Sequence, residues 1–184
     1  AIRIWDEPLE DGPLEDVSTR AALMAPVVED EDPLLVLSGV QAADDGYGAT
    51  GVSLARTLGA QWAAVVNDLS LALSTDTARV RQELEGGIEA VTNVDLPAVL
   101  TIQSGINDPR YASLRGLQEA QSQEIDSRTP ADLGVDDATL EPALTRGSLA
   151  EPEAKNDTEY VEGDPDEQAE AVAGLLVEHG VIEE

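Results

Sequence analysis

Three short apolar runs limit what this chain can fold into. They occupy residues 34–37, 62–66 and 97–101, and none of them alternates with polar residues. Runs of this length without alternation are typical of strands that are buried on both faces of a parallel sheet. Because the segment at 52–58 has the pattern of a helix, the sequence predicts an α/β fold.

A further strand, a helix and a hairpin are predicted around these runs. Residues 2–5 alternate as a strand does, and Ser18 is a candidate cap for the helix that follows. The segments 80–84 and 88–94 alternate on either side of Gly86-Gly87, which predicts a hairpin. Matching their apolar positions requires a three-residue loop with a left-handed glycine.

The C-terminal part has a different pattern. Residues 151–163 form an acidic linker, and Asp164-Pro165-Asp166-Glu167 resembles a capping box. The amphipathic helix that it begins should end near His179. We therefore expect an α/β domain at 1–136, followed by a linker and helical arm at 137–184.

Charge is the strongest compositional signal. Against 38 acidic residues there are ten basic ones, of which Lys155 is the only lysine, and the formal net charge is −28. Such a chain repels itself in dilute buffer, whereas at about 1 M salt the Debye length falls to about 3 Å. This composition favours a salt-rich cytoplasm, although an acidic protein of ordinary cells has the same features. It argues against nucleic-acid binding, which requires a basic surface.

Several other classes are unlikely on composition. Without cysteine the chain has no disulfide, iron–sulfur cluster or thiolate zinc site, and His179 is its single histidine. No apolar run approaches the roughly 18 residues that a membrane span needs. Nor do the first residues show a basic stretch before an apolar one, so no signal peptide is expected and we predict a cytoplasmic protein without a metal site.

The loop at 39–51 is the clearest candidate for a ligand site. It joins a buried strand to a helix, at the edge where α/β sheets bind ligands. The helix start offers free N–H groups to a phosphate, and Thr50 adds a hydroxyl. A Gly-rich loop can also be only a tight turn. Gly46-x-Gly48-x-x-Gly51 satisfies the dinucleotide pattern weakly, since it does not follow the strand directly.

Five motifs in order resemble the electron transfer flavoprotein beta subunit. They are Gly39-x-Gln41-Ala42-x-Asp44-Asp45 with Thr50-Gly51, the Arg81 to Glu89 hairpin, Leu96-Pro97-Ala98-Val99, Asn107-Asp108-Pro109-Arg110-Tyr111-Ala112-Ser113-Leu114, and Ala131-Asp132-Leu133-Gly134-Val135-Asp136. The resemblance implies a three-layer, adenine-nucleotide-binding fold of the HUP or Rossmann-like type. Its parallel sheet would carry an antiparallel hairpin excursion and a C-terminal helical arm.

The resemblance also implies an electron carrier and not an enzyme. Members pair with an alpha subunit that holds FAD, accept electrons from acyl-CoA dehydrogenases in fatty acid beta-oxidation and from other flavoprotein dehydrogenases, and pass them to a membrane quinone oxidoreductase. The beta subunit binds AMP, or a second FAD in bifurcating, Fix-type members. The nucleotide would be held by Gly39, Val40, Gln41, Ala42, Ala43, Asp44, Asp45, Gly46, Tyr47, Gly48, Ala49, Thr50 and Gly51.

The resemblance places partner recognition in residues 102–124, with Leu114 as its apolar anchor. A helix that begins at Ser113 would show Leu114 and Leu117 on one face, although both could instead pack inward. Arg110 could bind a partner or form only a surface ion pair. The recognition residues would be Asn107, Pro109, Arg110, Tyr111, Leu114 and Leu117.

Some features depart from the family. Residues 118–124 lack the usual lysines, and Val40 replaces a lysine beside the nucleotide, so AMP and FAD stay open. Two further βα units precede the equivalent of residues 2–5 in the family. We therefore expect missing N-terminal strands, an open sheet edge and weak nucleotide binding by this chain alone. A nucleotide-dependent transferase or dehydrogenase using Asp44 or Asp45, and a nucleotide-sensing stress-type domain, are the alternatives.

Overall fold

The structure is a computed structural model that describes residues 1–10, 12–151 and 160–182. The chain divides into two units, Ala1–Gly147 and Ser148–Glu184, and each is described by itself. In unit 1, residues 137–147 belong with the α/β part, so this unit extends beyond the boundary expected at residue 136.

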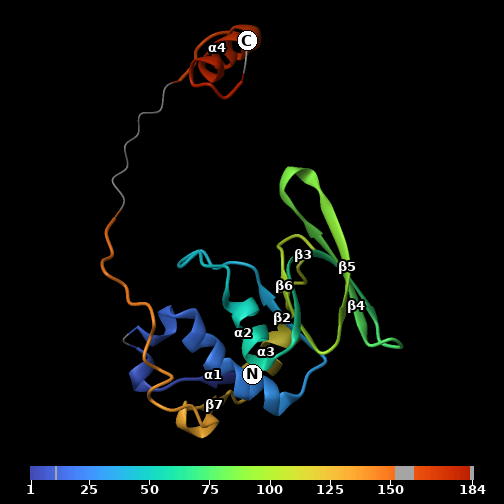
Figure 1. Cartoon of the computed structure of the whole chain (residues 1–184), viewed down its shortest axis with the longest axis vertical. Helices are drawn as coiled ribbons and strands as arrows, with labels where there is room; N and C mark the ends of the chain where they lie inside the picture. The colour runs from blue at the N-terminus through green and yellow to red at the C-terminus, as the bar shows by residue number, and fades with distance from the viewer. Residues whose placement is uncertain (11, 152–159, 183–184) are drawn as a thin grey trace. The chain divides into compact units, whose positions relative to one another are not determined.

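The strands predicted from the three apolar runs form the parallel part of a mixed sheet. The expected burial on both faces is wrong for two of them, because Leu37 is 55% exposed and Trp62 is 53% exposed. The central strand β6 (Ala98–Ile102) is buried from its first to its fourth residue. It pairs in parallel with β2 (Leu35–Gly39) on one side and with β3 (Gln61–Ala72) on the other. The sheet continues antiparallel through β4 (Thr77–Glu83) and β5 (Glu89–Asp95), in the order β2-β6-β3-β4-β5. Figure 1 shows β4 and β5 as a long green hairpin beside the parallel strands.

The strand β3 is longer than its apolar run. We predicted a strand at 62–66, but β3 continues to Ala72 and forms a hairpin with β4 that was not predicted. The two parts meet at a bulge, where Val65 has a φ of 57° and the register to both neighbours shifts. Thr101 Oγ1 accepts a hydrogen bond from the Val65 N–H at 2.9 Å, which holds this unfavourable conformation.

The predicted β4–β5 hairpin is confirmed. The Leu84 N–H donates to the Ile88 carbonyl at 2.7 Å, so these residues face each other as expected. The connecting turn η3 (Glu85–Gly87) has three residues, and both of its glycines are left-handed. On the inner face of the sheet, the hairpin residues Ala78, Val80 and Val94 pack with Ala63, Val66, Ala98 and Leu100 to form the largest core cluster.

Two helices cover the other face of the parallel strands. Helix α1 (Val17–Glu31) continues through Pro26, and α2 (Thr50–Leu58) ends at left-handed Gly59. The cap of α1 is not Ser18 but Asp16, whose carboxylate accepts from the backbone N–H groups that follow it. The helices pack together through Ala21, Ala25 and Leu54, with Val36 of β2 beneath them.

A second, two-stranded parallel sheet lies in unit 1. It pairs β1 (Ile2–Ile4) with β7 (Asp126–Arg128). Short 3₁₀ turns accompany it: η1 (Glu7–Leu9), η2 (Pro13–Glu15) and η4 (Ala131–Leu133), the last ending at Gly134 as predicted. Leu9, Leu23 and Leu140 form a separate small core there. Three of the five strand pairings among the described residues are parallel, and the arrangement fits a three-layer α/β fold.

Unit 2 contains α4 (Pro165–Glu178), and its predicted capping box is confirmed. Asp164 accepts from the backbone N–H groups of Asp166 and Glu167, and the Glu167 carboxylate accepts from the Asp164 N–H. The apolar side chains of α4 stay partly exposed, with Val172 at 46%. Part of the predicted linker, residues 152–159, lies outside the described residues.

Candidate functional site

The two loops singled out by the sequence begin side by side. Gly39 at the end of β2 is paired with Ile102 at the end of β6. Because these strands are parallel, both loops leave the sheet from the same edge, where α/β sheets bind ligands. A cavity of about 670 Å³ lies there, within the usual size range of ligand pockets. It is lined by Gly39, Val40, Gln41, Ile102, Gln103, Ser104, Gly105, Ile106, Asn107 and Pro109.

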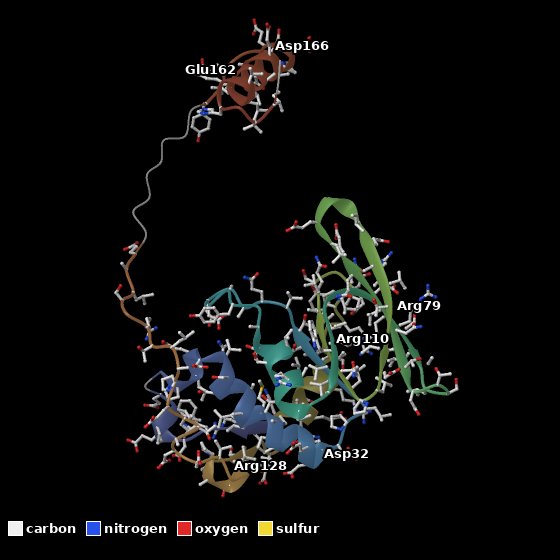
Figure 2. The ribbon with its side chains drawn as sticks, viewed as in Figure 1. Asp32, Arg79, Arg110, Arg128, Glu162 and Asp166 are labelled. Carbon is white, nitrogen blue, oxygen red and sulfur yellow. The ribbon has the colours of Figure 1, made fainter. Side chains whose placement is uncertain are left out.

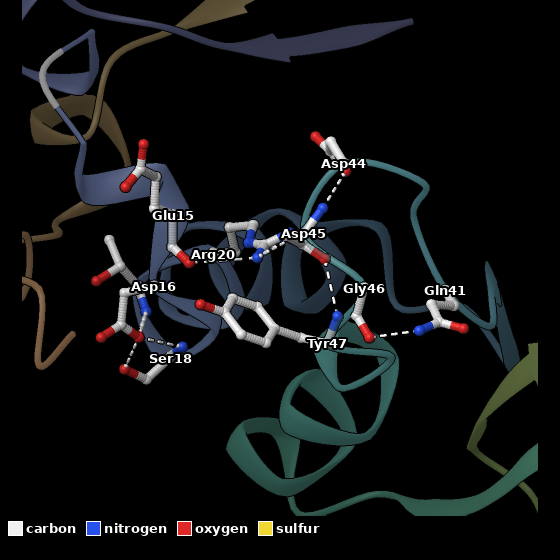
Figure 3. A network of polar contacts seen from close by, with 10 residues as sticks. Glu15, Asp16, Ser18, Arg20, Gln41, Asp44, Asp45, Gly46 and Tyr47 are labelled. Atoms are coloured by element: carbon white, nitrogen blue, oxygen red, sulfur yellow. Dashed lines mark hydrogen bonds and ion pairs between the residues drawn. The ribbon is translucent and has the colours of Figure 1, made fainter. Parts of the chain in front are cut away.

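The rest of the first loop forms a turn that is hydrogen-bonded to itself. The Gly46 N–H donates to the Ala42 carbonyl at 3.2 Å, and the Tyr47 N–H donates to Asp45 Oδ1 at 3.1 Å. The Gln41 side-chain amide donates to the Gly46 carbonyl, which connects the turn to the cavity wall (Figure 3). Gly46 and Gly48 have positive φ values of 67° and 62°, a conformation that glycine adopts without strain.

The start of α2 is suited to an anion. Its cap position is Ala49, which supplies no side-chain hydrogen bond to the first N–H groups of the helix. Uncapped N–H groups at the positive end of the helix dipole are the usual donors to a phosphate. Thr50, which is partly buried at the first helical position, adds a hydroxyl group. These donors belong to the same loop that begins at the cavity.

Gly51 allows close packing between α2 and the sheet. A Cβ atom there would lie 2.6 Å from Thr101 Cγ2 and closer still to Ser38 Oγ. The missing side chain therefore lets α2 sit directly on β2 and β6. This is the role that the third glycine has in dinucleotide-binding loops.

An ion pair joins the first loop to α1. Asp45 Oδ2 accepts a hydrogen bond from Arg20 Nη2 at 2.5 Å, and both side chains are 22% exposed. The hydrogen bond from the Tyr47 N–H and the bond from Arg20 lower the pKa of Asp45. A carboxylate with a lowered pKa is a weaker base, so Asp45 is poorly matched to the role of a general base near neutral pH. This counts against an enzyme that would use Asp45.

The second loop presents apolar side chains to solvent. Helix α3 (Leu114–Gln121) is capped by Ser113, whose hydroxyl accepts from the Gly116 N–H at 3.1 Å. Leu114 is 82% exposed and Leu117 49% exposed, while Tyr111 just before the helix is 97% exposed. The alternative that both leucines pack inward therefore does not describe this chain. Exposed large apolar residues grouped in this way are typical of a protein-binding surface.

Basic side chains are few and scattered. Figure 2 shows Arg79 on β4, Arg110 in the loop after β6, and Arg128 in β7. Arg128 bonds Asp30 and Asp126, whereas Arg110 is exposed in the second loop. In the described ranges, no cluster of three or more acidic or histidine side chains is arranged to hold a metal ion. No helix among the same residues has the length and apolar content of a membrane span.

Comparison with known proteins identifies the family. The family described as "Electron transfer flavoprotein domain" matches residues 1–133. The electron transfer flavoprotein subunit beta of Methylophilus methylotrophus is 36% identical over 180 residues, covering 97% of this chain and 67% of that protein. The chain belongs to the electron transfer flavoprotein beta subunit family. The subunits of Bacillus subtilis and Homo sapiens are 31% and 37% identical over 149 and 116 residues.

These matches cover unequal parts of the proteins. The Bacillus subtilis match covers 81% of this chain and 57% of the relative, and the human match covers 63% and 44%. The chain thus spans between about half and two thirds of the length of these electron transfer flavoprotein beta subunits. The family resemblance noted from the five motifs is confirmed by these matches.

In this electron transfer flavoprotein beta fold, the predicted site residues of the first loop fall into three groups. Gly39 to Gln41 line the cavity, residues 42–48 form the turn, and Ala49 to Gly51 start α2. In the second loop, Asn107 and Pro109 line the cavity, while Arg110, Tyr111, Leu114 and Leu117 are exposed beyond it. Gln103 lies in the segment 102–124 predicted for partner recognition, but the sequence did not indicate that it lines the cavity. Arg20 beside the turn was missed, because it belongs to no recognisable local motif.

Proposed function

We propose that this chain is the beta subunit of an electron transfer flavoprotein, working as a carrier and not as an enzyme. It would form a heterodimer with an FAD-binding alpha subunit in the cytoplasm. The heterodimer would take electrons from acyl-CoA dehydrogenases or other flavoprotein dehydrogenases and deliver them to a membrane quinone oxidoreductase. FAD would accept the electrons, and the residues of this chain would bind a nucleotide and dock the partner proteins.

One observation carries the proposal. The recognition loop starts at the wall of the cavity and ends in the exposed side chains of Tyr111 and Leu114, so a partner bound to them would stand beside the cavity. A subunit that only positions a cofactor and a partner needs such a layout. It needs no acid, base or nucleophile in the cavity.

The residues of the first loop fit an adenine nucleotide. The cavity has room for one, and the uncapped start of α2 offers donors to a phosphate. The acidic pair Asp44 and Asp45 opposes an anion, but Asp45 is neutralised by Arg20. We propose AMP as the ligand of this subunit, with a second FAD as the bifurcating, Fix-type alternative.

Co-expression with an alpha subunit tests the function. We expect a heterodimer that purifies with yellow colour from FAD and releases AMP on denaturation. Release of two FAD molecules per heterodimer and no AMP would indicate the bifurcating type instead. If no complex forms in molar salt, or if the complex accepts no electrons from any flavoprotein dehydrogenase supplied, the proposed function is wrong.

Replacing Leu114 with alanine should weaken docking to the dehydrogenase. Its side chain is 82% exposed in the free chain and would be buried in the complex, so we expect kcat/KM for electron transfer to fall about tenfold. The measurement is the rate of flavin reduction at increasing dehydrogenase concentration. Leu73, which is 65% exposed on the β3–β4 turn, gives the matched control. Equal effects of L114A and L73A would contradict the proposed docking site.

Salt should stabilise the chain strongly if it belongs to a salt-rich cytoplasm. With a net charge of −28, self-repulsion is largest in dilute buffer and is largely screened at about 1 M salt. We expect the midpoint of thermal unfolding to rise by about 10 °C or more between 0.05 M and 1 M potassium chloride, which for a chain of this length corresponds to about 3 kcal/mol or more. A midpoint that does not change over this range would contradict a salt-adapted protein.

A further inference from the structure

Among the described residues of unit 1, the turn at residues 42–48 makes one polar side-chain contact with another helix or strand. Its own hydrogen bonds, including those donated by the Gly46 and Tyr47 N–H groups, end on atoms of the same loop. Among the described residues, the one hydrogen bond that connects it to a helix or strand joins Asp45 to Arg20 of α1. Figure 3 shows this bond reaching from the α1 helix to the turn.

Apolar packing contributes little to holding the turn. None of residues 40–49 belongs to the three core clusters of the described chain. Tyr47, the only large side chain of the turn, is 55% exposed. The internal hydrogen bonds give the turn its shape, but they cannot set its place relative to the sheet. Apart from the chain connections to β2 and α2 at its two ends, the contact with Arg20 is the described polar contact that can set this place.

Arg20 is held in a position that suits this role. Its Nη2 atom also approaches the Glu15 carbonyl at 3.4 Å, and its Nε atom is buried without a hydrogen-bond partner. The contact with the carbonyl of Glu15 in η2 and the burial of Nε leave the guanidinium little freedom to turn away. With 22% of each side chain exposed, the pair is screened by salt less than a fully exposed pair.

We propose that Arg20 is a positioning residue for the ligand loop. Its ion pair with Asp45 fixes the turn at 42–48 against α1, and this sets the turn's place between the cavity and the uncapped start of α2. The effect on nucleotide affinity rests on the proposed function of the loop. The placement of the turn is independent of that function, and it can be measured without any ligand.

Hydrogen exchange of the full 184-residue chain in 1 M potassium chloride tests the placement. In Arg20→Gln, which keeps most of the side-chain volume, we expect amides in peptides covering 42–48 to exchange about tenfold faster. Peptides from α2 and β6 should change by less than about twofold. Arg56→Gln, on α2 and outside any described ion pair, is the control and should leave the turn unchanged.

The charge-exchanged variant Arg20→Asp/Asp45→Arg separates the effect of the electrostatic attraction from the effect of side-chain size. If the ion pair positions the turn, this variant should restore slow exchange that each single change has lost. Unchanged exchange in Arg20→Gln, or no recovery in the double variant, would overturn the proposal.

Affinity for AMP in the complex with an alpha subunit gives the second measurement. We expect the Kd to rise about fivefold to tenfold in Arg20→Gln and to recover in the charge-exchanged variant. Faster exchange with an unchanged Kd would show that the turn is not positioned for a ligand, and would overturn that part. If the unaltered complex binds neither AMP nor FAD at this loop, the proposed ligand fails, while the exchange results still decide whether Arg20 positions the turn.

Discussion

Replacing Gly51 with alanine is expected to lower the free energy of unfolding by about 2 kcal/mol. The new Cβ atom would lie 2.6 Å from Thr101 Cγ2, a buried methyl group on a β-branched side chain. Thr101 cannot turn away freely, because its Oγ1 accepts the hydrogen bond that holds the bulge at Val65. Urea denaturation in about 1 M salt, where self-repulsion is screened, measures the change.

A second substitution makes the cause of this loss testable. Thr101→Ser removes Cγ2 but keeps the Oγ1 acceptor, so it should cost only about 1 kcal/mol by itself. In the double variant G51A/T101S we expect a loss about 1 kcal/mol smaller than the sum of the single losses, because the clash with Thr101 Cγ2 is relieved while the one with Ser38 Oγ remains. Gly116→Ala on α3, where the new Cβ would be 3.4 Å from Ser113 Oγ, is the control. Strict additivity would show that packing against Thr101 is not the cause.

Replacing Asp16 with asparagine should destabilise unit 1 by about 2–3 kcal/mol. The Asp16 carboxylate is 3% exposed and receives hydrogen bonds from two parts of the chain. One oxygen caps α1 at Ser18, at 2.7 Å from its N–H, and the other accepts from the N–H groups of Ala143 and Leu144 at 2.7 and 3.1 Å. In asparagine an NH₂ group replaces one of the two oxygens, so its N–H groups would face backbone N–H donors that need an acceptor. Asp136→Asn, an exposed carboxylate that bonds only Thr139, is the matched control.

The same carboxylate predicts how stability depends on pH. The Ser18 hydroxyl, together with the backbone N–H groups and against the effect of burial, lowers the pKa of Asp16 from 3.8 to about 2. Because the folded pKa is the lower one, this stabilisation of about 2 kcal/mol is fully present above pH 4 and is lost as the pH falls toward 2. The stability difference between the native chain and D16N should therefore shrink between pH 5 and pH 2. A difference that stays constant would contradict this assignment.

Gly51 and Asp16 both fix the position of a helix that flanks the candidate site. Gly51 sets how closely α2 lies on β2 and β6, and Asp16 fixes the start of α1, from which Arg20 reaches the ligand loop. Neither residue needs to touch a ligand. Changes at either position should therefore alter ligand affinity only indirectly, by shifting the helices that flank the loop. The free energy of unfolding should fall at the same time.

Local patterns were sufficient for the elements whose signals lie in neighbouring residues. The apolar runs predicted β2 and β6, Gly86-Gly87 predicted the β4–β5 turn, and Asp164 with Glu167 predicted the cap of α4. The motifs also placed both loops in the right order along the chain. Strand alternation beyond residue 66 was missed because the bulge at Val65 changes the face of each following side chain.

The sequence alone determined the α/β class, the approximate positions of the parallel strands and the family, because short-range hydrophobic pattern and turn chemistry do not depend on distant contacts. The tertiary structure decided what brings distant residues together. Asp16 meets Ala143, Arg20 meets Asp45, and Gly51 meets Thr101 only after the chain has folded. It also decided that Leu114 faces solvent, since a three-residue spacing gives a helix face but not the direction in which that face points.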